Sequence, residues 1–331
     1  MPAPVRRKLP FACLSLLALA FVLSGTALAG NGGIAPPADS PNAERIRDLH
    51  WLLLGIAGTI FVLVEGTLIA FVIRFRNGGR PRELEGPQIR GHTRLELIWT
   101  AIPVLILAVI ISAVFYKLPG IKNVPEAGAS GPKLTVRVEG HQFYWRYIYP
   151  NGAVSVNELR VPAGRPIEVK ITAPAYDVIH SWWVPALAGK MDAIPGKVNT
   201  TWFETPLKPG KFEGQCAEYC GIQHALMPAV VRSVPEADFD AWVSSQLRQS
   251  SDLGKQTYEG ACGPCHGLTG NGLIGPSLKG NATISQRQQL IRLLRNGKNA
   301  MPPVGRGWDQ TQLDALIRYL RQHIVGAAGG G

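Results

Sequence analysis

Two long apolar runs restrict most strongly what this chain can fold into. The run from His50 to Ile73 is interrupted only by Glu65, and residues 97–116 carry no charged side chain. Each run has about the 20 residues that a helix needs to cross the hydrocarbon core of a bilayer. We therefore predict two membrane-spanning helices, at about 50–73 and 96–117. A pair of helices buried inside a water-soluble protein is the alternative.

The segments around these runs indicate their direction. Residues 74–94, between the two runs, hold six arginines and two glutamates, and short loops rich in arginine stay in the cytoplasm. The N-terminus and everything after Tyr116 then lie outside. Residues 1–29 agree, because a basic start, an apolar stretch and the small residues at 27–29 are typical of a secretory signal. A cleavable signal and an uncleaved membrane anchor both fit this pattern.

A stretch further along the chain, residues 214–227, concentrates metal-binding side chains. Four of them lie within twelve residues: Cys216, Cys220, His224 and Met227. Thiolates with an imidazole suit zinc, copper or iron, and the added thioether favours copper, because methionine is a soft ligand. Two thiolates at this spacing can bridge a pair of copper ions, and His180 is the strong candidate for the second imidazole that the pair needs. A zinc site or a disulfide between the two cysteines is the alternative.

A second cluster lies nearer the C-terminus. Cys262, Cys265 and His266 have the Cys-x-x-Cys-His spacing by which c-type haem is attached. The two thiols would bond the haem vinyl groups, and His266 would bind the iron from one side. Met301, 35 residues after His266, is the candidate sixth ligand. A Met/His pair raises the reduction potential of haem iron into the range of electron carriers. A zinc half-site, or for Met301 a core methionine, is the alternative.

The cysteines and the charge narrow the functional classes. Cys13 lies in the signal segment and the other four cysteines lie in the two motifs, so none remains for a structural disulfide. The net charge of +11 is not gathered into basic clusters interleaved with aromatic residues, so a nucleic-acid partner is not expected. Such a charge favours contact with anionic lipid or with the acidic face of a partner.

The segments between the motifs predict strands and then helices. After a Gly/Pro-rich linker at 120–132, apolar residues alternate with polar ones over 134–138 and again over 167–171, which predicts a Greek-key β-sandwich or barrel. A short helix is expected over 237–247, with Phe239, Trp242, Val243 and Leu247 facing inward. A polar hinge follows, and Asp309 is expected to cap a final helix that buries Leu313, Ile317, Leu320 and Ile324.

The metal-binding stretch, together with residues 180–185 and 190–196, closely resembles the dinuclear copper (CuA) region of cytochrome c oxidase subunit II. Residues 258–303 resemble class I cytochromes c. Over about residues 45–303 the chain resembles a caa3-type subunit II with a fused C-terminal cytochrome c domain. The resemblance implies a two-helix transmembrane hairpin, a cupredoxin-like Greek-key β-barrel and an all-α class I cytochrome c domain. It also implies the copper ligands His180, Cys216, Cys220, His224, Met227 and the backbone carbonyl of Glu218.

The resemblance implies further roles. The carboxylate of Glu218 would reach a magnesium or manganese ion shared with subunit I, and Glu96 would stand at the mouth of a proton-uptake path. A solvated loop acid and a helix N-terminal acid are the respective alternatives. Phe143, Tyr144 and Trp145 match a stretch near the electron-entry surface. Phe143 stands where the family has a tryptophan, which departs from the usual docking route for soluble cytochrome c. Core packing is the alternative, above all for Trp145.

These expectations combine into one organisation. We predict a signal peptide at 1–29, an N-terminal segment with the hairpin at 30–120, a copper domain at 121–243, a linker at 244–252 and a cytochrome c domain at 253–326. The resemblance implies the electron-entry subunit of a proton-translocating oxidase in the bacterial inner membrane, whose oxygen-reducing site lies in subunit I. Its implied partners are subunits I and III, a cytochrome c donor and membrane lipid.

Three other functions are the alternatives. A membrane-anchored electron carrier for another reductase, such as nitrous oxide reductase, would keep both redox centres. A nitrous oxide reductase itself would need a separate histidine-rich copper domain, and this chain has seven histidines in all. A quinol oxidase subunit would keep the fold but lack the copper ligands.

Overall fold

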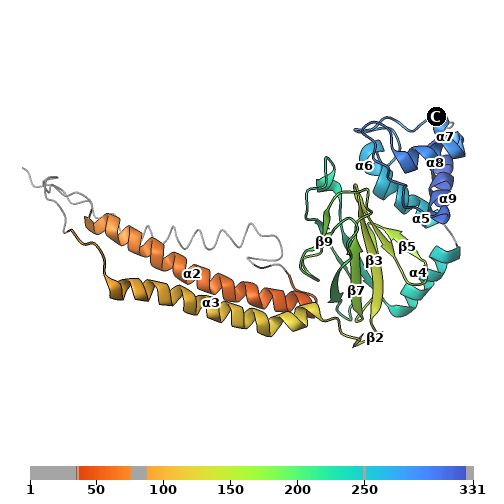
Figure 1. The fold of residues 1–331 in the computed structure, drawn as a ribbon. Coiled ribbons are helices and arrows are strands. Elements are labelled where there is room, and N and C mark those ends of the chain that lie inside the picture. The colour runs from red at the N-terminus through yellow and green to blue at the C-terminus, as the bar shows by residue number, and fades with distance from the viewer. Residues whose placement is uncertain (1–34, 36, 76–87, 249–250, 326–331) are drawn as a thin grey trace, which may run out of the picture. The chain divides into compact units, whose positions relative to one another are not determined.

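The computed structural model describes residues 35, 37–75, 88–248 and 251–325, so the signal segment and most of the arginine-rich loop lie outside the described residues. Two apolar helices occupy the N-terminal part: α2 (Pro41–Phe75) and α3 (Thr93–Lys122). They run in opposite directions (Figure 1), and within the described ranges both are long and apolar enough to cross a membrane. Large apolar side chains are exposed along both helices, as expected where lipid covers them.

The end of α3 differs from the expected linker at 120–132. The helix continues to Lys122, and residues 127–128 and 131–132 form the short paired strands β1 and β2. The carbonyl of Ile121, in the last turn, accepts hydrogen bonds from Nε1 of Trp202 at 2.9 Å and from Nδ2 of Asn42 at 3.3 Å. Because side chains satisfy a carbonyl that a helix end leaves unpaired, the helix extends beyond the predicted boundary.

Residues 127–248 form a domain of short strands, called here the strand domain. Its main sheet has the order β10-β7-β3-β4-β5, in which β3 and β7 are parallel, and two smaller sheets have the orders β11-β13-β6 and β12-β8-β9. The strands are β3 (Leu134–His141), β4 (Tyr144–Ile148), β5 (Val154–Val156), β6 (Glu158–Pro162), β7 (Pro166–Thr172), β8 (His180–Trp183), β9 (Met191–Ala193), β10 (Asn199–Glu204), β11 (Gly210–Phe212), β12 (Gln215–Cys216) and β13 (Val230–Val234).

The alternating pattern in the sequence places one face of each central strand in the core. Val136 and Val138 of β3 and Ile167, Val169 and Ile171 of β7 are fully buried, where they pack with Trp182 and Phe203. This confirms the period-two prediction for both strands. The tight turns at Gly152 and Gly164 have φ of +86° and +71°, a conformation that glycine adopts without steric cost.

The predicted helix after the strands is present as α4 (Glu236–Arg248). Phe239, Trp242 and Val243 are buried as expected, but Leu247 is 57% exposed and Gln246 is buried in its place. The prediction for Leu247 is therefore wrong. Residues three and four apart lie on the same face of a helix, and Gln246 stands four residues after Trp242 and three after Val243. Gln246 therefore lies on the buried face, and Leu247 lies beside it towards solvent. The predicted hinge is helical at both ends, since α4 reaches Arg248 and α5 begins at Ser251.

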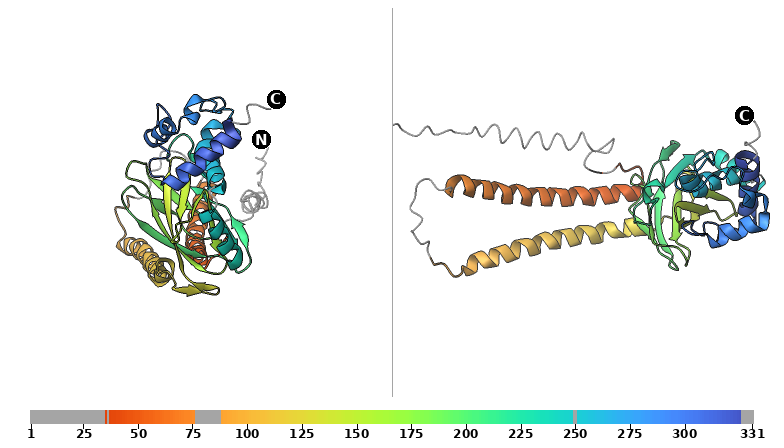
Figure 2. Two further views of the ribbon diagram at one scale, coloured as in Figure 1. Left: turned by 90° about the vertical axis from the view of Figure 1, so that its right-hand side faces the viewer. Right: turned by 90° about the horizontal axis from the view of Figure 1, so that it is seen from above.

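Residues 251–325 form a second, helical region, called here the helical module. It contains α5 (Ser251–Thr257), the π-helical segment η2 (Tyr258–Cys262), α6 (Gly263–His266), α7 (Ala282–Ser285), α8 (Arg287–Asn296), α9 (Gln310–Tyr319) and the π-helical segment η3 (Leu320–Val325). Asp309 caps α9 by accepting a hydrogen bond from the backbone N–H of Gln312 at 2.8 Å. The predicted cap is confirmed, and so is the burial of all four predicted apolar residues, Leu313, Ile317, Leu320 and Ile324. Figures 1 and 2 show these helices in blue beside the strand domain, with α5 against β5.

Candidate metal centre and haem-binding cavity

The metal-binding side chains of the strand domain come from two neighbouring strands and one loop. His180 opens β8 and Cys216 ends β12, and these strands are paired so that Cys216 lies opposite Trp182. Cys220 lies in the loop that follows, and His224 opens the short turn η1 (His224–Leu226). Met227 lies beside the end of β12, because its carbonyl accepts a hydrogen bond from the backbone N–H of Cys216 at 3.0 Å. The fold therefore closes residues 216–227 into one loop.

The donor atoms of this loop converge. Ligand atoms of His180, Cys216 and Cys220 all lie within 4.8 Å of one another, and all three residues are buried. Sγ of Cys220 lies 3.6 Å from Nδ1 of His224 and 3.9 Å from Sδ of Met227. The backbone oxygen of Glu218 lies 3.2 Å from Sγ of Cys216. Two sulfurs at the centre, with an imidazole and a further weak donor beside each, form a set that suits soft metal ions.

Close backbone packing holds the loop in place. Gly214 runs so near β8 that a Cβ there would collide with the carbonyl of Trp183, and Gly221 has a φ of +130° that favours glycine. The backbone N–H of Ala217 donates to the carbonyl of Ser181 at 2.8 Å. These contacts position the cysteines without a disulfide, and both thiols are free. The disulfide alternative for Cys216 and Cys220 is therefore absent from the described structure.

Charged and polar neighbours tune the donors. Burial opposes a charge on the His180 ring, but the carboxylate of Asp177, 3.1 Å from Nε2, and the thiol of Cys216 together raise its pKa. That contact directs Nδ1 of His180 towards the sulfurs, 4.0 Å from Sγ of Cys216. The Cys220 thiol donates to Cys216 and so lowers the pKa of Cys216, and the same contact raises the pKa of Cys220. The pair thus readily yields one thiolate, the form that binds metals.

The haem motif of the helical module lines a separate cavity of about 460 Å³. Such a volume lies within the range of about 300–1,000 Å³ that is usual for ligand pockets. Cys262, Cys265, His266 and Met301 all line it, and its other walls are largely apolar, with Ile284, Leu290, Leu294, Val304 and Leu320. Burial raises the pKa of Cys262 to about 12 and also raises the pKa of Cys265. An apolar cavity with two free thiols, an imidazole and a thioether fits a covalently attached haem.

A hydrogen bond already orients the proposed iron ligand. Nδ1 of His266 lies 2.8 Å from the carbonyl oxygen of Pro276, to which it can donate its proton. Nε2 is then the unprotonated nitrogen, and a second nitrogen fixed in this way is the usual arrangement of a metal-binding imidazole.

The remaining predicted residues lie in different settings. The side chain of Glu218 is exposed beside the two cysteines. Glu96 lies in the first turn of α3, where its carboxylate accepts a hydrogen bond from the backbone N–H of His92 at 3.0 Å, as an acid in a first helical turn commonly does. Phe143, Tyr144 and Trp145 are all buried, and Phe143 lines the haem-binding cavity. Tyr144 is covered by residues of the helical module.

Two residues that contact the metal-binding site were not predicted from the sequence. Asp177, which orients His180, stands three residues before it, a spacing that could have drawn attention to it. Gln142 donates from Nε2 to the carbonyl of Cys220 at 2.6 Å and also lines the haem-binding cavity. Nothing in the local sequence marks Gln142, because its importance arises from contacts 78 residues away along the chain.

Comparisons with known proteins agree with this arrangement. Residues 30–117 match the family "Cytochrome C oxidase subunit II, transmembrane domain", and residues 153–234 match its periplasmic domain. Residues 249–320 match "Cytochrome C oxidase, cbb3-type, subunit III".

Individual relatives cover most of the chain. A probable cytochrome c oxidase subunit 2 from Rickettsia bellii is 36% identical over 243 residues, which are 66% of this chain and 86% of the relative. A cytochrome c oxidase subunit 2 from Alkalihalophilus pseudofirmus is 29% identical over 309 residues, 85% of this chain and 88% of the relative. Among solved structures, the periplasmic domain of cytochrome oxidase subunit II from Bradyrhizobium japonicum is 37% identical and covers 38% of this chain and 98% of its own, with a TM-score of 0.34. The chain belongs to the cytochrome c oxidase subunit II family and carries a cytochrome c domain after its periplasmic domain.

Proposed function

We propose that this chain receives electrons from a cytochrome c at its own haem, passes them to a dinuclear copper centre, and delivers them to subunit I of a haem-copper oxidase. The observation that carries the proposal is the presence of two donor sets in one chain: four donors around two free thiols, and an apolar cavity with the haem attachment motif in its wall. Both centres, when loaded, supply one-electron transfer, and the oxygen chemistry takes place in subunit I.

The chain's own residues would hold and shape these centres. Cys216, Cys220, His180, His224, Met227 and the Glu218 carbonyl would hold the two copper ions, with His180 and Met227 on the buried side of the loop. Cys262 and Cys265 would hold the haem covalently, and His266 and Met301 would bind its iron. Asp177 and the carbonyl of Pro276 orient the two imidazoles before any metal binds. Rigid ligands change position little between oxidation states, which favours fast electron transfer.

The partners follow from the same assignment. Two apolar helices place the chain in a membrane, and we assign it to the bacterial inner membrane beside subunits I and III, with residues 127–325 on the periplasmic side. Glu218 is exposed next to the thiols, so its carboxylate is free to take part in a magnesium or manganese site shared with subunit I. Glu96 would stand at the entrance of the proton path, in addition to its contact with His92.

The electron donor would dock on the helical module. By its sequence, residues 251–325 contain nine basic and four acidic residues, so a carrier with an acidic face around its own redox centre is the complementary partner. Its association rate should then fall as the salt concentration rises, because screening weakens steering between opposite charges.

The test is purification of the chain from membranes, with metal analysis and spectroscopy. We expect about two coppers and one covalent haem per chain, a mixed-valence copper signal on partial reduction, and co-purification of a haem-copper subunit. Met227→Leu should alter only the copper signal, and Met301→Leu only the haem spectrum, so each variant controls for the other. Zinc in place of copper would overturn the copper assignment, and the absence of an oxidase subunit would favour a free-standing electron carrier.

A further inference from the structure

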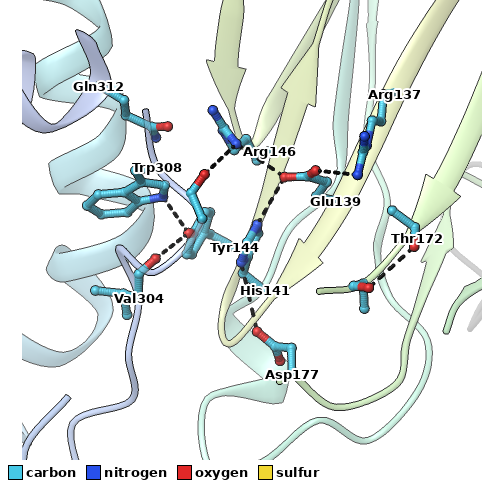
Figure 3. A network of polar contacts seen from close by, with 12 residues as sticks. Arg137, Glu139, His141, Tyr144, Arg146, Thr172, Asp177, Val304, Trp308 and Gln312 are labelled. Carbon is cyan, nitrogen blue, oxygen red and sulfur yellow. Dashed lines mark hydrogen bonds and ion pairs between the residues drawn. The ribbon is translucent and has the colours of Figure 1, made fainter. Parts of the chain in front are cut away.

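A buried tyrosine joins the strand domain to the helical module. The hydroxyl of Tyr144, in β4, donates to the carbonyl of Val304 at 2.8 Å and accepts a hydrogen bond from Nε1 of Trp308 at 2.7 Å. Figure 3 shows both bonds crossing from the strand to the loop before α9. Tyr144 is 0% and Trp308 3% exposed. On the strand side, the ring of His141 stacks on Tyr144 with 4.7 Å between ring centroids.

An arginine two residues further along the same strand adds a charged contact. Arg146 donates to the carbonyl of Gly307 at 3.2 Å and pairs with the carboxylate of Asp309 at 3.1 Å. It also pairs with Glu139 of its own domain at 3.3 Å, so a buried guanidinium is shared between the two regions. Asp309 at the same time caps α9. The start of the module's last helix is therefore tied to β4.

The apolar cores of the two regions are also continuous. Tyr144 and Val156 of the strand domain belong to the same buried cluster as the centre of the helical module, and Val154 packs with Leu253 and Ala315. The backbone of the module at Gly260 comes so close that a Cβ there would lie 2.5 Å from Cγ1 of Val156. A module that separated from the strand domain would expose this apolar surface to water.

The docked arrangement brings the two candidate redox sites together. Gln142 and Phe143, which immediately precede Tyr144, line the haem-binding cavity alongside the module's own residues. Gln142 also donates to the carbonyl of Cys220 in the metal-binding loop. A direct bond also joins the metal-binding loop to the haem motif, because Nε2 of Gln223 donates to the carbonyl of Pro264 at 3.3 Å. Protein atoms alone thus connect the two sites in this pose.

We propose that Tyr144 and Arg146 are positioning residues that hold the helical module in one docked pose, so that residues 141–145 serve the fused module and are closed to a soluble carrier. The benefit for electron transfer rests on the proposed function, whereas the docking itself needs only the contacts described above. A fixed pose removes the search step that a module on a loose tether would repeat at every electron transfer.

The test separates docking from covalent linkage in the full-length, haem-loaded chain. A protease site is inserted between Arg248 and Ser251, the chain is cleaved in detergent, and gel filtration follows the haem absorbance. The cleaved parent protein should keep the haem with the membrane-bound fragment. Tyr144→Phe leaves the Trp308 N–H and the Val304 carbonyl without their partner, so the dissociation constant should rise roughly tenfold or more. Tyr147→Phe is the matched control, because the hydroxyl of Tyr147 accepts from Trp182 inside the strand domain at 3.2 Å.

A second variant does not depend on removing a hydrogen bond. Gly260→Ala should favour the local helical turn, since alanine is the better helix former, yet its Cβ would collide with Val156 in the docked pose. We therefore expect a module that is at least as resistant to thermal unfolding after cleavage but is released from the strand domain. Retention equal to that of the parent protein would contradict the proposed pose.

The outcomes distinguish this inference from the proposed function. If the cleaved parent protein releases its haem fragment, or if Tyr144→Phe behaves like Tyr147→Phe, the docking inference is wrong, even when copper is still reduced. If the fragment stays bound but the haem never reduces copper, the docking stands and the proposed electron path fails. Slower haem-to-copper electron transfer in Tyr144→Phe, with unchanged haem and copper spectra, would support a positioning role. Unchanged spectra would show that both sites are still folded, so misfolding would not explain the slower rate.

Discussion

The strand domain and the helical module prepare their cofactor sites in opposite ways. In the strand domain, paired strands and close backbone contacts bring four further donor atoms around a buried pair of thiols that belongs to a buried apolar core. In the helical module, the four residues predicted to hold haem line a cavity of about 460 Å³. At the first site the donor atoms already converge in a packed domain. At the second site an apolar cavity remains, which the cofactor would fill. The copper site should thus depend on the fold, and the fold of the module should depend on haem.

The largest difference between the two regions is expected when the haem is removed. Cys262→Ala with Cys265→Ala prevents covalent attachment and leaves the cavity of about 460 Å³ without its filler. At about 24 cal/mol per Å³ the void would cost on the order of 10 kcal/mol, an upper bound for a partly open cavity and comparable to the whole stability of a small domain. We expect the module to unfold while the strand domain still folds and binds copper, as hydrogen exchange measured for each region would show.

The reverse experiment removes a copper ligand. Cys220→Ser should abolish the mixed-valence copper signal, because one of the two thiolate donors is lost, yet change the thermal midpoint of the strand domain little, since the loop is held by backbone contacts. Haem content should be unchanged. A strand domain that unfolds together with the loss of copper would show that its site is no more preformed than the haem cavity.

A smaller effect is expected from the residue that orients a ligand. Asp177→Asn removes the charge beside Nε2 of His180 but keeps the shape of the side chain. Replacing such a supporting group usually weakens metal binding about 10- to 100-fold. Copper competition with a chelator should show this loss, and Asp192→Asn is the control, because Asp192 lies on β9 opposite Ser181 rather than opposite His180. Equal copper affinity in both variants would show that Asp177 does not support copper binding through His180.

The smallest effect concerns acid stability of the strand domain. Burial would raise the pKa of Glu158, but its bonds to Arg232 and Arg160 lower it overall. A lowered pKa in the folded state adds stability that is present above the unfolded pKa of about 4.3 and is lost as the pH falls through the folded value. Because Glu158 is half-exposed, we expect less than about 1 kcal/mol. Glu158→Gln should flatten the decline in the domain's thermal midpoint below pH 5 and leave the module unaffected.

The sequence predicted much of this molecule because its main signals are local. Donor spacing identified the 216–227 loop and the haem motif, apolar length predicted α2 and α3, and the cap of Asp309 follows from one side chain near its own helix. Alternation of polar and apolar residues predicted β3 and β7. Each of these signals is contained within a short stretch of chain, where periodicity and ligand spacing apply directly.

What the sequence could not predict arises from distant contacts. The end of α3 is set by Trp202 and Asn42, each about 80 residues from Ile121. The aromatic run at 143–145 fitted an entry surface by resemblance, but the fused module covers Tyr144 through Val304 and Trp308, 160 and 164 residues away. The burial of Gln246 rather than Leu247 is a different case, because it follows the spacing of one face of α4, whereas side-chain polarity alone favours Leu247.

The central claim is that two redox centres work as one docked unit within a single chain. The most direct measurement is the rate at which a photoreduced haem reduces copper in the loaded, full-length protein. We predict a first-order rate that is independent of protein concentration and that survives cleavage between Arg248 and Ser251. A rate that grows with protein concentration, or one that disappears on cleavage, would contradict the account.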